Sequence, residues 1–212
     1  MSGAAALSSL DLAALLCSRV CHDLISPVGA IVNGLEVLEE GKDAATKDFA
    51  LDLIKKSART ASAKLQFCRI AFGAAGSAGA QIDTGDAETI SRSFLEDDKT
   101  KLAWNLPRAL LPKNRVKLLL NMLLIAGQAI PRGGSLTVEP IGTGESMGFK
   151  VAAAGANAKI PQGMAEQLSA DAGGAPVDAH RIQPLYTVLL AKDCKLAVGI
   201  ASEGEAVVVS AK

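Results

Sequence analysis

The stretch SRVCHDLISPVGAIVNGLEVL, residues 18–38, decides the fold of the N-terminal part of the chain. Apolar and small residues recur in it at alternating steps of three and four, which is typical of a helix that packs along another helix. The pattern continues in both directions, so the sequence predicts one helix over residues 9–40. The predicted seam consists of Leu10, Ala14, Cys17, Cys21, Leu24, Val28, Ile31, Leu35 and Leu38.

The same spacing predicts a second helix over residues 43–72. Its seam consists of Leu51, Ile54, Ala58, Ala61, Leu65, Cys68 and Phe72. Only Gly41 and Lys42 separate the two helices, so they must be antiparallel neighbours. Arms of roughly 30 residues make a hairpin about 45 Å long.

The apolar stripe of the first helix is wider than its seam. Leu16, Val20, Ala30 and Val37 lie beside the seam residues. A stripe of this width needs more than one partner helix. Two hairpins from two chains would form a four-helix bundle, so we expect a homodimer.

The rest of the chain predicts a second domain. Residues 73–80, GAAGSAGA, are small and are typical of a linker. Helical patterns follow at 86–97, 112–130, 161–168 and 179–191, and strand patterns at 101–106, 135–139, 148–152, 195–201 and 206–210. We expect an α+β protein: an N-terminal antiparallel hairpin over residues 1–75, and an α/β domain with a mostly antiparallel sheet over residues 82–212.

His22 is the candidate reactive residue. It follows the seam residue Cys21 directly, so the helical period turns it toward solvent. The helix neighbours that share or border its face are Ser18, Arg19, Ile25 and Ser26, with Gly29 two turns on. Asp23 or Ser26 could orient or deprotonate the ring, and Arg19 could steady phosphate charge. Pro27 has no N–H for the carbonyl of Asp23, so we expect a kink after His22.

Composition narrows the chemistry further. Lys plus Arg and Asp plus Glu both number 22, so the formal net charge is zero, which argues against nucleic-acid binding and electrostatic membrane docking. The chain has two histidines, so a multi-histidine metal site is nearly excluded. The N-terminus lacks a basic region ahead of its apolar run, and the apolar stretch 116–130 is too short to cross a membrane. We expect a cytoplasmic protein.

Simpler interpretations stand beside this one. His22 is also compatible with an ordinary surface histidine on a helix. Cys17 and Cys21 have the spacing of metal ligands, but their seam positions favour small core residues. His180 follows Asp178 near a predicted helix start, where a local hydrogen bond is a simpler role than catalysis.

CHDLISP, residues 21–27, resembles the phosphoacceptor box of histidine kinases, in which an acid follows the histidine and a proline stands five residues after it. Residues 120–126 and 130–138 resemble the kinase ATP-binding domain. The asparagine that holds magnesium in kinases is here Ile125, which cannot bind a hard cation. The aspartate that reads adenine is Ala153, and the second glycine of that box is Asn157. The resemblance therefore implies a Bergerat-type ATPase fold that no longer binds ATP.

The chain as a whole resembles the ChpT-type histidine phosphotransferases of the alphaproteobacterial cell-cycle phosphorelay. The strings that carry the likeness are residues 18–38 and HRIQPLYTVLLA, residues 180–191. The family implies a homodimer with His22 as phosphocarrier, no cofactor of its own, and a CckA-like hybrid kinase whose receiver domain is the phosphoryl donor. It implies CtrA-like and CpdR-like regulators as acceptors, with magnesium held by the partner receiver. The receiver would dock around Ser18, Arg19, Asp23, Ile25, Ser26 and Gly29.

Three other functions remain open from the sequence. An active histidine kinase would share His22 but need ATP. A dimeric scaffold would not use His22 at all. A phosphatase acting on response regulators would use a related helical hairpin.

Overall fold

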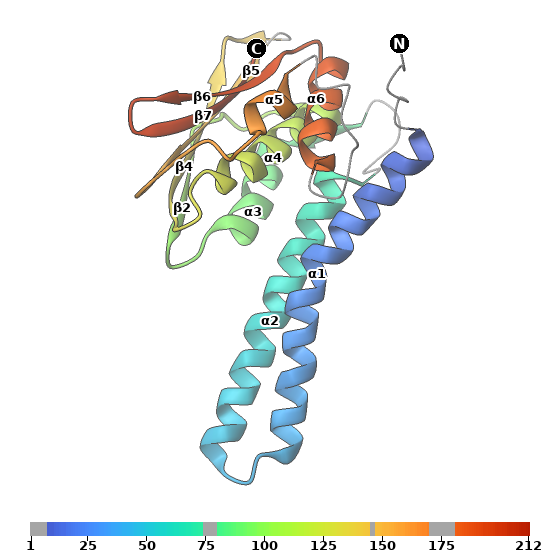
Figure 1. The fold of residues 1–212 in the computed structure, drawn as a ribbon, viewed down its shortest axis with the longest axis vertical. Helices are drawn as coiled ribbons and strands as arrows, with labels where there is room; N and C mark the ends of the chain where they lie inside the picture. The colour runs from blue at the N-terminus through green and yellow to red at the C-terminus, as the bar shows by residue number, and fades with distance from the viewer. Residues whose placement is uncertain (1–7, 74–79, 145–146, 170–180) are drawn as a thin grey trace.

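The computed structural model describes residues 8–73, 80–144, 147–169 and 181–212. It consists of a long helical hairpin and an α/β part beside one end of that hairpin (Figure 1). Helices α1 (Ser9–Glu40) and α2 (Ala44–Ala71) form the hairpin, which confirms the helices predicted over 9–40 and 43–72. Asp43 caps α2 by accepting a hydrogen bond from the Thr46 N–H at 2.9 Å, and hydrogen bonds from Thr46 lower the pKa of its carboxyl.

The two helices meet along a line displaced from the predicted seam. Pro27 and Gly34 are the buried residues of α1. A Cβ at position 34 would lie 2.7 Å from Ile54 Cγ1, so only glycine permits this approach. The seam residues Val28 and Leu35 remain 48% and 45% exposed. The close approach at Gly34 decides which side of α1 faces α2, and an apolar strip is left uncovered.

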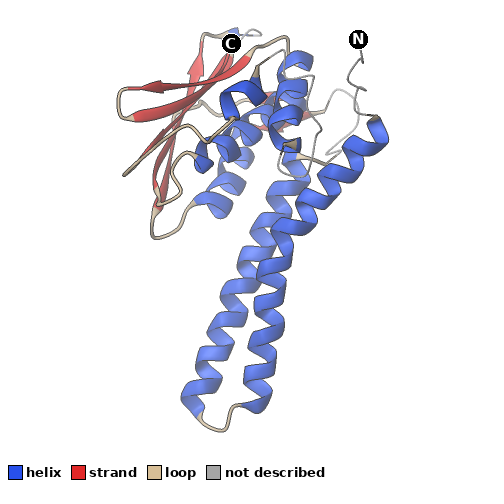
Figure 2. Cartoon of the chain, in the orientation of Figure 1, coloured by secondary structure: helices blue, strands red, loops and turns tan. Residues whose placement is uncertain are grey.

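The remainder of the chain forms a sheet with helices on one side (Figure 2). The helices are α3 (Thr84–Leu95), α4 (Lys113–Gln128), α5 (Met164–Leu168) and α6 (Ile182–Asp193). The main strands are β2 (Thr100–Trp104), β4 (Gly134–Ile141), β5 (Gly148–Ala154), β6 (Val198–Glu203) and β7 (Ala206–Ala211). They lie in the order β2-β4-β5-β7-β6, and only the β2–β4 pair is parallel. This confirms the predicted α+β class with a mostly antiparallel sheet.

Most predicted elements are present, with informative differences. The pair β1 (Gln81–Asp83) and β3 (Leu110–Pro112) was not predicted, because three residues are too few to show a period. Helix α5 begins later than predicted, after Gly163, which has a φ of +75°. Pro184 lies in the first turn of α6, where its missing N–H breaks no helical hydrogen bond.

Helix α4 is the centre of the core. Residues 116–123 of this helix are all buried, because β5 and β7 lie on one side of it and α2 and α6 on others. Asn121 is fully buried and donates hydrogen bonds to the carbonyls of Lys117 and Ala71. The second bond links α4 to the last turn of α2, and so joins the hairpin to the α/β part.

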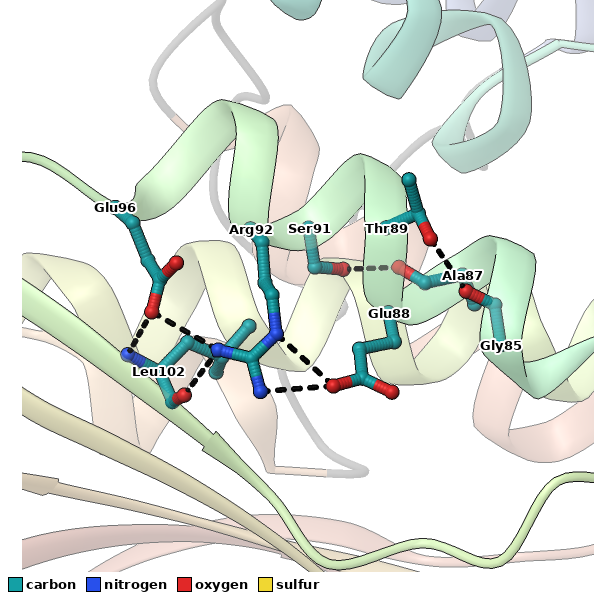
Figure 3. A network of polar contacts seen from close by, with 8 residues as sticks. All are labelled: Gly85, Ala87, Glu88, Thr89, Ser91, Arg92, Glu96 and Leu102. Carbon is teal, nitrogen blue, oxygen red and sulfur yellow. Dashed lines mark hydrogen bonds and ion pairs between the residues drawn. The ribbon is translucent and has the colours of Figure 1, made fainter.

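Arg92 anchors α3 to the sheet (Figure 3). Its guanidinium pairs with Glu88 at 2.8 Å and Glu96 at 2.9 Å, and donates to the carbonyl of Leu102 in β2. Glu96 in turn accepts from the Leu102 N–H at 3.0 Å. These charge-assisted bonds hold the edge strand against the helix.

Candidate functional site

His22 lies on α1 with its side chain 80% exposed. Its Nδ1 is 3.6 Å from Asp23 Oδ1. Because Nδ1 faces the carboxylate, Nε2 is on the far side of the ring and points away from it. An imidazole with one nitrogen beside a carboxylate and the other in solvent is suited to act as a nucleophile.

Asp23 lies in the groove between the helices, with its side chain 21% exposed. Arg19 Nε donates to Asp23 Oδ2 at 3.0 Å, and Lys64 Nζ from α2 donates to the Asp23 carbonyl at 2.9 Å. Two cations therefore hold this residue, one through its carboxylate and one through its backbone.

The predicted neighbours of His22 divide into two groups. Ser18, Ser26 and Ile25 are exposed, Ile25 by 69%. A Cβ added at Gly29 would meet no atom within 4 Å, so the surface beside that residue is open. Arg19 differs from the prediction: it is 22% exposed and turned to Asp23, because the i to i+4 ion pair draws it into the groove.

The cysteines near His22 lie on the uncovered side of α1. Cys17 and Cys21 are exposed in the single chain, so α2 does not cover them. They line an apolar groove of about 420 Å³ with Leu16, Val20, Leu65 and Phe72. The displacement of the helix contact toward Pro27 and Gly34 is the cause. Among the described residues, no group of three or more His, Cys, Asp or Glu side chains could hold a metal ion.

Cys68 also lines this groove and is buried. Burial, with the negative charge of Asp23, raises the pKa of its thiol to about 11. The thiol therefore stays protonated at neutral pH and is a poor nucleophile.

The kinase-like positions of the α/β part do not fit a magnesium nucleotide. Ile125 and Ala153 are fully buried within the apolar core. Neither side chain offers an oxygen to a metal or an acceptor to an adenine amino group. His180, the other histidine, lies outside the described residues.

Comparisons with known proteins identify the family of the chain. Residues 84–206 match the model of the histidine phosphotransferase C-terminal domain. The chain belongs to the histidine phosphotransferase family. Protein phosphotransferase ChpT of Brucella abortus (strain 2308) is 54% identical over 212 residues, covering 100% of both chains. As a member of this family, the protein is a phosphotransferase.

Solved structures extend the likeness to the fold. A bacterial phosphotransferase structure is 50% identical with a TM-score of 0.88, covering 100% of both chains. Full-length ShkA in complex with AMPPNP is a more distant match at 18% identity and a TM-score of 0.45, covering 92% of this chain and 44% of that one. The likeness at a TM-score of 0.88 includes the hairpin, which lies outside the matched family domain.

Sequence reasoning missed one residue of the site. Lys64 lies 41 positions after Asp23 and belongs to no motif around the histidine. The sequence shows that Pro27 leaves a carbonyl unpaired, but only the register of the two helices shows which side chain reaches it.

Helix α1 has a further property. Among the residues that the structure describes, it is the one helix long and apolar enough to cross a membrane by length and composition. Val28 and Leu35 are among its exposed apolar residues.

Proposed function

We propose that this phosphotransferase carries the phosphoryl group on His22. The observation that supports this most is the exposed imidazole whose Nδ1 faces Asp23. Nε2 attacks the phosphorus of a receiver aspartyl phosphate, a P–N bond forms and the P–O bond to the aspartate breaks. Asp23 stabilises the proton on Nδ1, and a second receiver aspartate later takes the group.

The donor we propose is the receiver domain of a CckA-like hybrid kinase, and the acceptors are CtrA-like and CpdR-like regulators of the cell cycle. The receiver brings its own magnesium and lysine. It docks on the exposed side of α1 formed by Ser18, Ile25, Ser26 and Gly29, with Arg19 at the border. The open surface at Gly29 supports this location, because no atom of the described residues lies within 4 Å of a Cβ placed there.

The active form we propose is a homodimer. Residues 1–75 serve as the dimerisation and phosphotransfer hairpin, and residues 82–212 as a degenerate ATPase-like domain. The uncovered apolar residues of α1 and α2, among them Val28, Leu35, Leu51 and Leu65, are suited to pack in a four-helix bundle. Such packing explains the apolar character of α1 in a cytoplasmic protein.

The α/β part contributes no cofactor of its own in this proposal. Buried Ile125 and Ala153 stand where a kinase would hold magnesium and adenine. The phosphoryl group therefore enters from a receiver and not from ATP.

A transfer assay with a labelled receiver tests the proposal. The wild-type protein should take label from the phosphorylated donor receiver and pass it to an acceptor receiver, and His22→Ala should do neither. Transfer that survives His22→Ala, or no transfer to the wild type, contradicts the proposal.

The same assay separates the other functions. Incubation with labelled ATP alone should leave the protein unlabelled, whereas strong self-labelling would indicate a kinase. Loss of label from the receiver as free phosphate, without labelled His22, would indicate a phosphatase. A scaffold would leave the receiver fully labelled.

A further inference from the structure

The hydrogen bond between Lys64 and Asp23 has a specific cause in the sequence. In an α-helix the carbonyl of residue 23 accepts from the N–H of residue 27. Residue 27 is proline, which has no N–H, so the Asp23 carbonyl loses its helical partner. Figure 1 shows that α1 also bends away from α2 toward its N-terminal end, as a helix interrupted by proline does.

Lys64 replaces the missing donor. Its Nζ lies 2.9 Å from the Asp23 carbonyl, in a partly buried position between the helices. A buried carbonyl without a donor is costly, and an ammonium makes a stronger bond than the amide it replaces. The bond ties α2 to a peptide carbonyl in the interior of α1 that has no N–H donor within the helix.

Asp23 is therefore held both at its carboxylate and at its backbone carbonyl. Arg19 fixes Oδ2 of the carboxylate, and Lys64 fixes the backbone oxygen. Oδ1, the remaining oxygen, is the atom that faces His22 Nδ1. Movement of the Asp23 peptide would move this oxygen relative to the ring.

We propose that Lys64 is a positioning residue for phosphotransfer: by replacing the N–H that Pro27 lacks, it holds Asp23 where its carboxylate orients His22. This inference rests on the proposed role of His22. Lys64 acts through Asp23 and does not touch the reacting atoms. Together, Arg19 and Lys64 also outweigh the one negative charge of Asp23, which favours a phosphoryl group beside the ring.

Single-turnover transfer from the phosphorylated receiver to the full-length protein tests this, with receiver concentration varied. Lys64→Met should lower the maximal rate about tenfold, as expected for a misplaced reacting group, with little change in the half-saturating receiver concentration. Lys64→Arg should restore most of the rate, because it keeps a charged donor. Lys56→Met, on the same helix, is the matched control and should transfer normally.

Pro27→Ala makes the test specific. Alanine supplies the missing N–H to the Asp23 carbonyl, so Lys64 should become redundant. Adding Lys64→Met to Pro27→Ala should change the maximal rate less than twofold. A lysine that only holds the helices together would lower the rate equally in both backgrounds.

Three results would overturn the inference: an unchanged rate in Lys64→Met, a change confined to the half-saturating concentration, or an equal loss in the Pro27→Ala background. The thermal unfolding midpoints of all variants check that they fold. If Lys64→Met is unstable, Lys64→Arg still tests the inference, because a charged donor at this position should keep most of the rate. Failure of the proposed function is distinguishable, because then the wild type takes no label or His22→Ala takes it.

Discussion

At the scale of single residues, the two glycines of α1 have opposite roles. A Cβ at Gly34 would lie 2.7 Å from Ile54 Cγ1, whereas a Cβ at Gly29 would meet no atom of the described residues within 4 Å. Gly34 is required by the hairpin itself. Gly29 lowers the stability of the helix, and no close contact of α1 with α2 requires a glycine there. The surface beside it can therefore accept a partner protein.

We predict that Gly29→Ala raises the free energy of unfolding by about 0.5–1 kcal/mol, because alanine is the better helix former. The added methyl should raise the half-saturating receiver concentration in the transfer assay. Urea unfolding and transfer kinetics measure the two effects. Gly34→Ala is the control and should destabilise; a Gly29→Ala variant that transfers normally would remove Gly29 from the docking surface.

Two cysteine thiols with raised pKa values, those of buried Cys68 and half-buried Cys194, predict a pH effect on stability. Burial raises the pKa of Cys68 and of Cys194 to about 11 in the folded protein, against an ordinary value of 9.0. The folded state thus favours the protonated thiols, and this stability is complete below pH 9 and is lost as pH rises from 9 to 11. Urea midpoints at pH 8 and pH 10.5 should show the decline, and the double variant Cys68→Ala with Cys194→Ala should show a smaller one.

At the scale of elements, the link between α2 and α4 depends on Asn121. Its amide donates to Ala71 at the end of α2 and to Lys117 in α4. We predict that Asn121→Ala lowers the free energy of unfolding by about 1–3 kcal/mol, because a carbonyl at the junction loses its partner and a cavity opens. Chemical denaturation measures the loss. An unchanged stability would show that apolar packing alone joins the hairpin to the α/β part.

At the scale of the whole molecule, the uncovered strip of the hairpin predicts self-association. Val28→Glu combined with Leu35→Glu should yield a monomer, since charges there cannot pack in a bundle core. Light scattering after size exclusion measures the mass. Asn33→Glu, at an exposed polar position of α1 outside the apolar stripe, is the control and should remain a dimer. A dimer that persists in the double variant would place the interface elsewhere.

Much of this organisation was predictable because it depends on local periods. The bounds of α1 and α2, the alternation of strands and helices, and the outward position of His22 all follow from spacing within one element. The identities of Ile125 and Ala153, on which the proposed absence of an ATP site rests, are also visible without a structure. The spacing did not show which side of the wide α1 stripe α2 covers: the contact lies at Pro27 and Gly34, and Cys17 and Cys21 are exposed in the single chain.

The sequence by itself determined the helices, the outward histidine and the carbonyl that Pro27 leaves without a donor. Only the tertiary structure decided that Gly34 meets Ile54, that Arg19 turns inward to Asp23, and that Lys64 completes the site. The physical reason is the separation along the chain of the residues that interact. A helical period is set by hydrogen bonds four residues apart, whereas the donor for Asp23 comes from a residue 41 positions away and depends on how closely two helices approach.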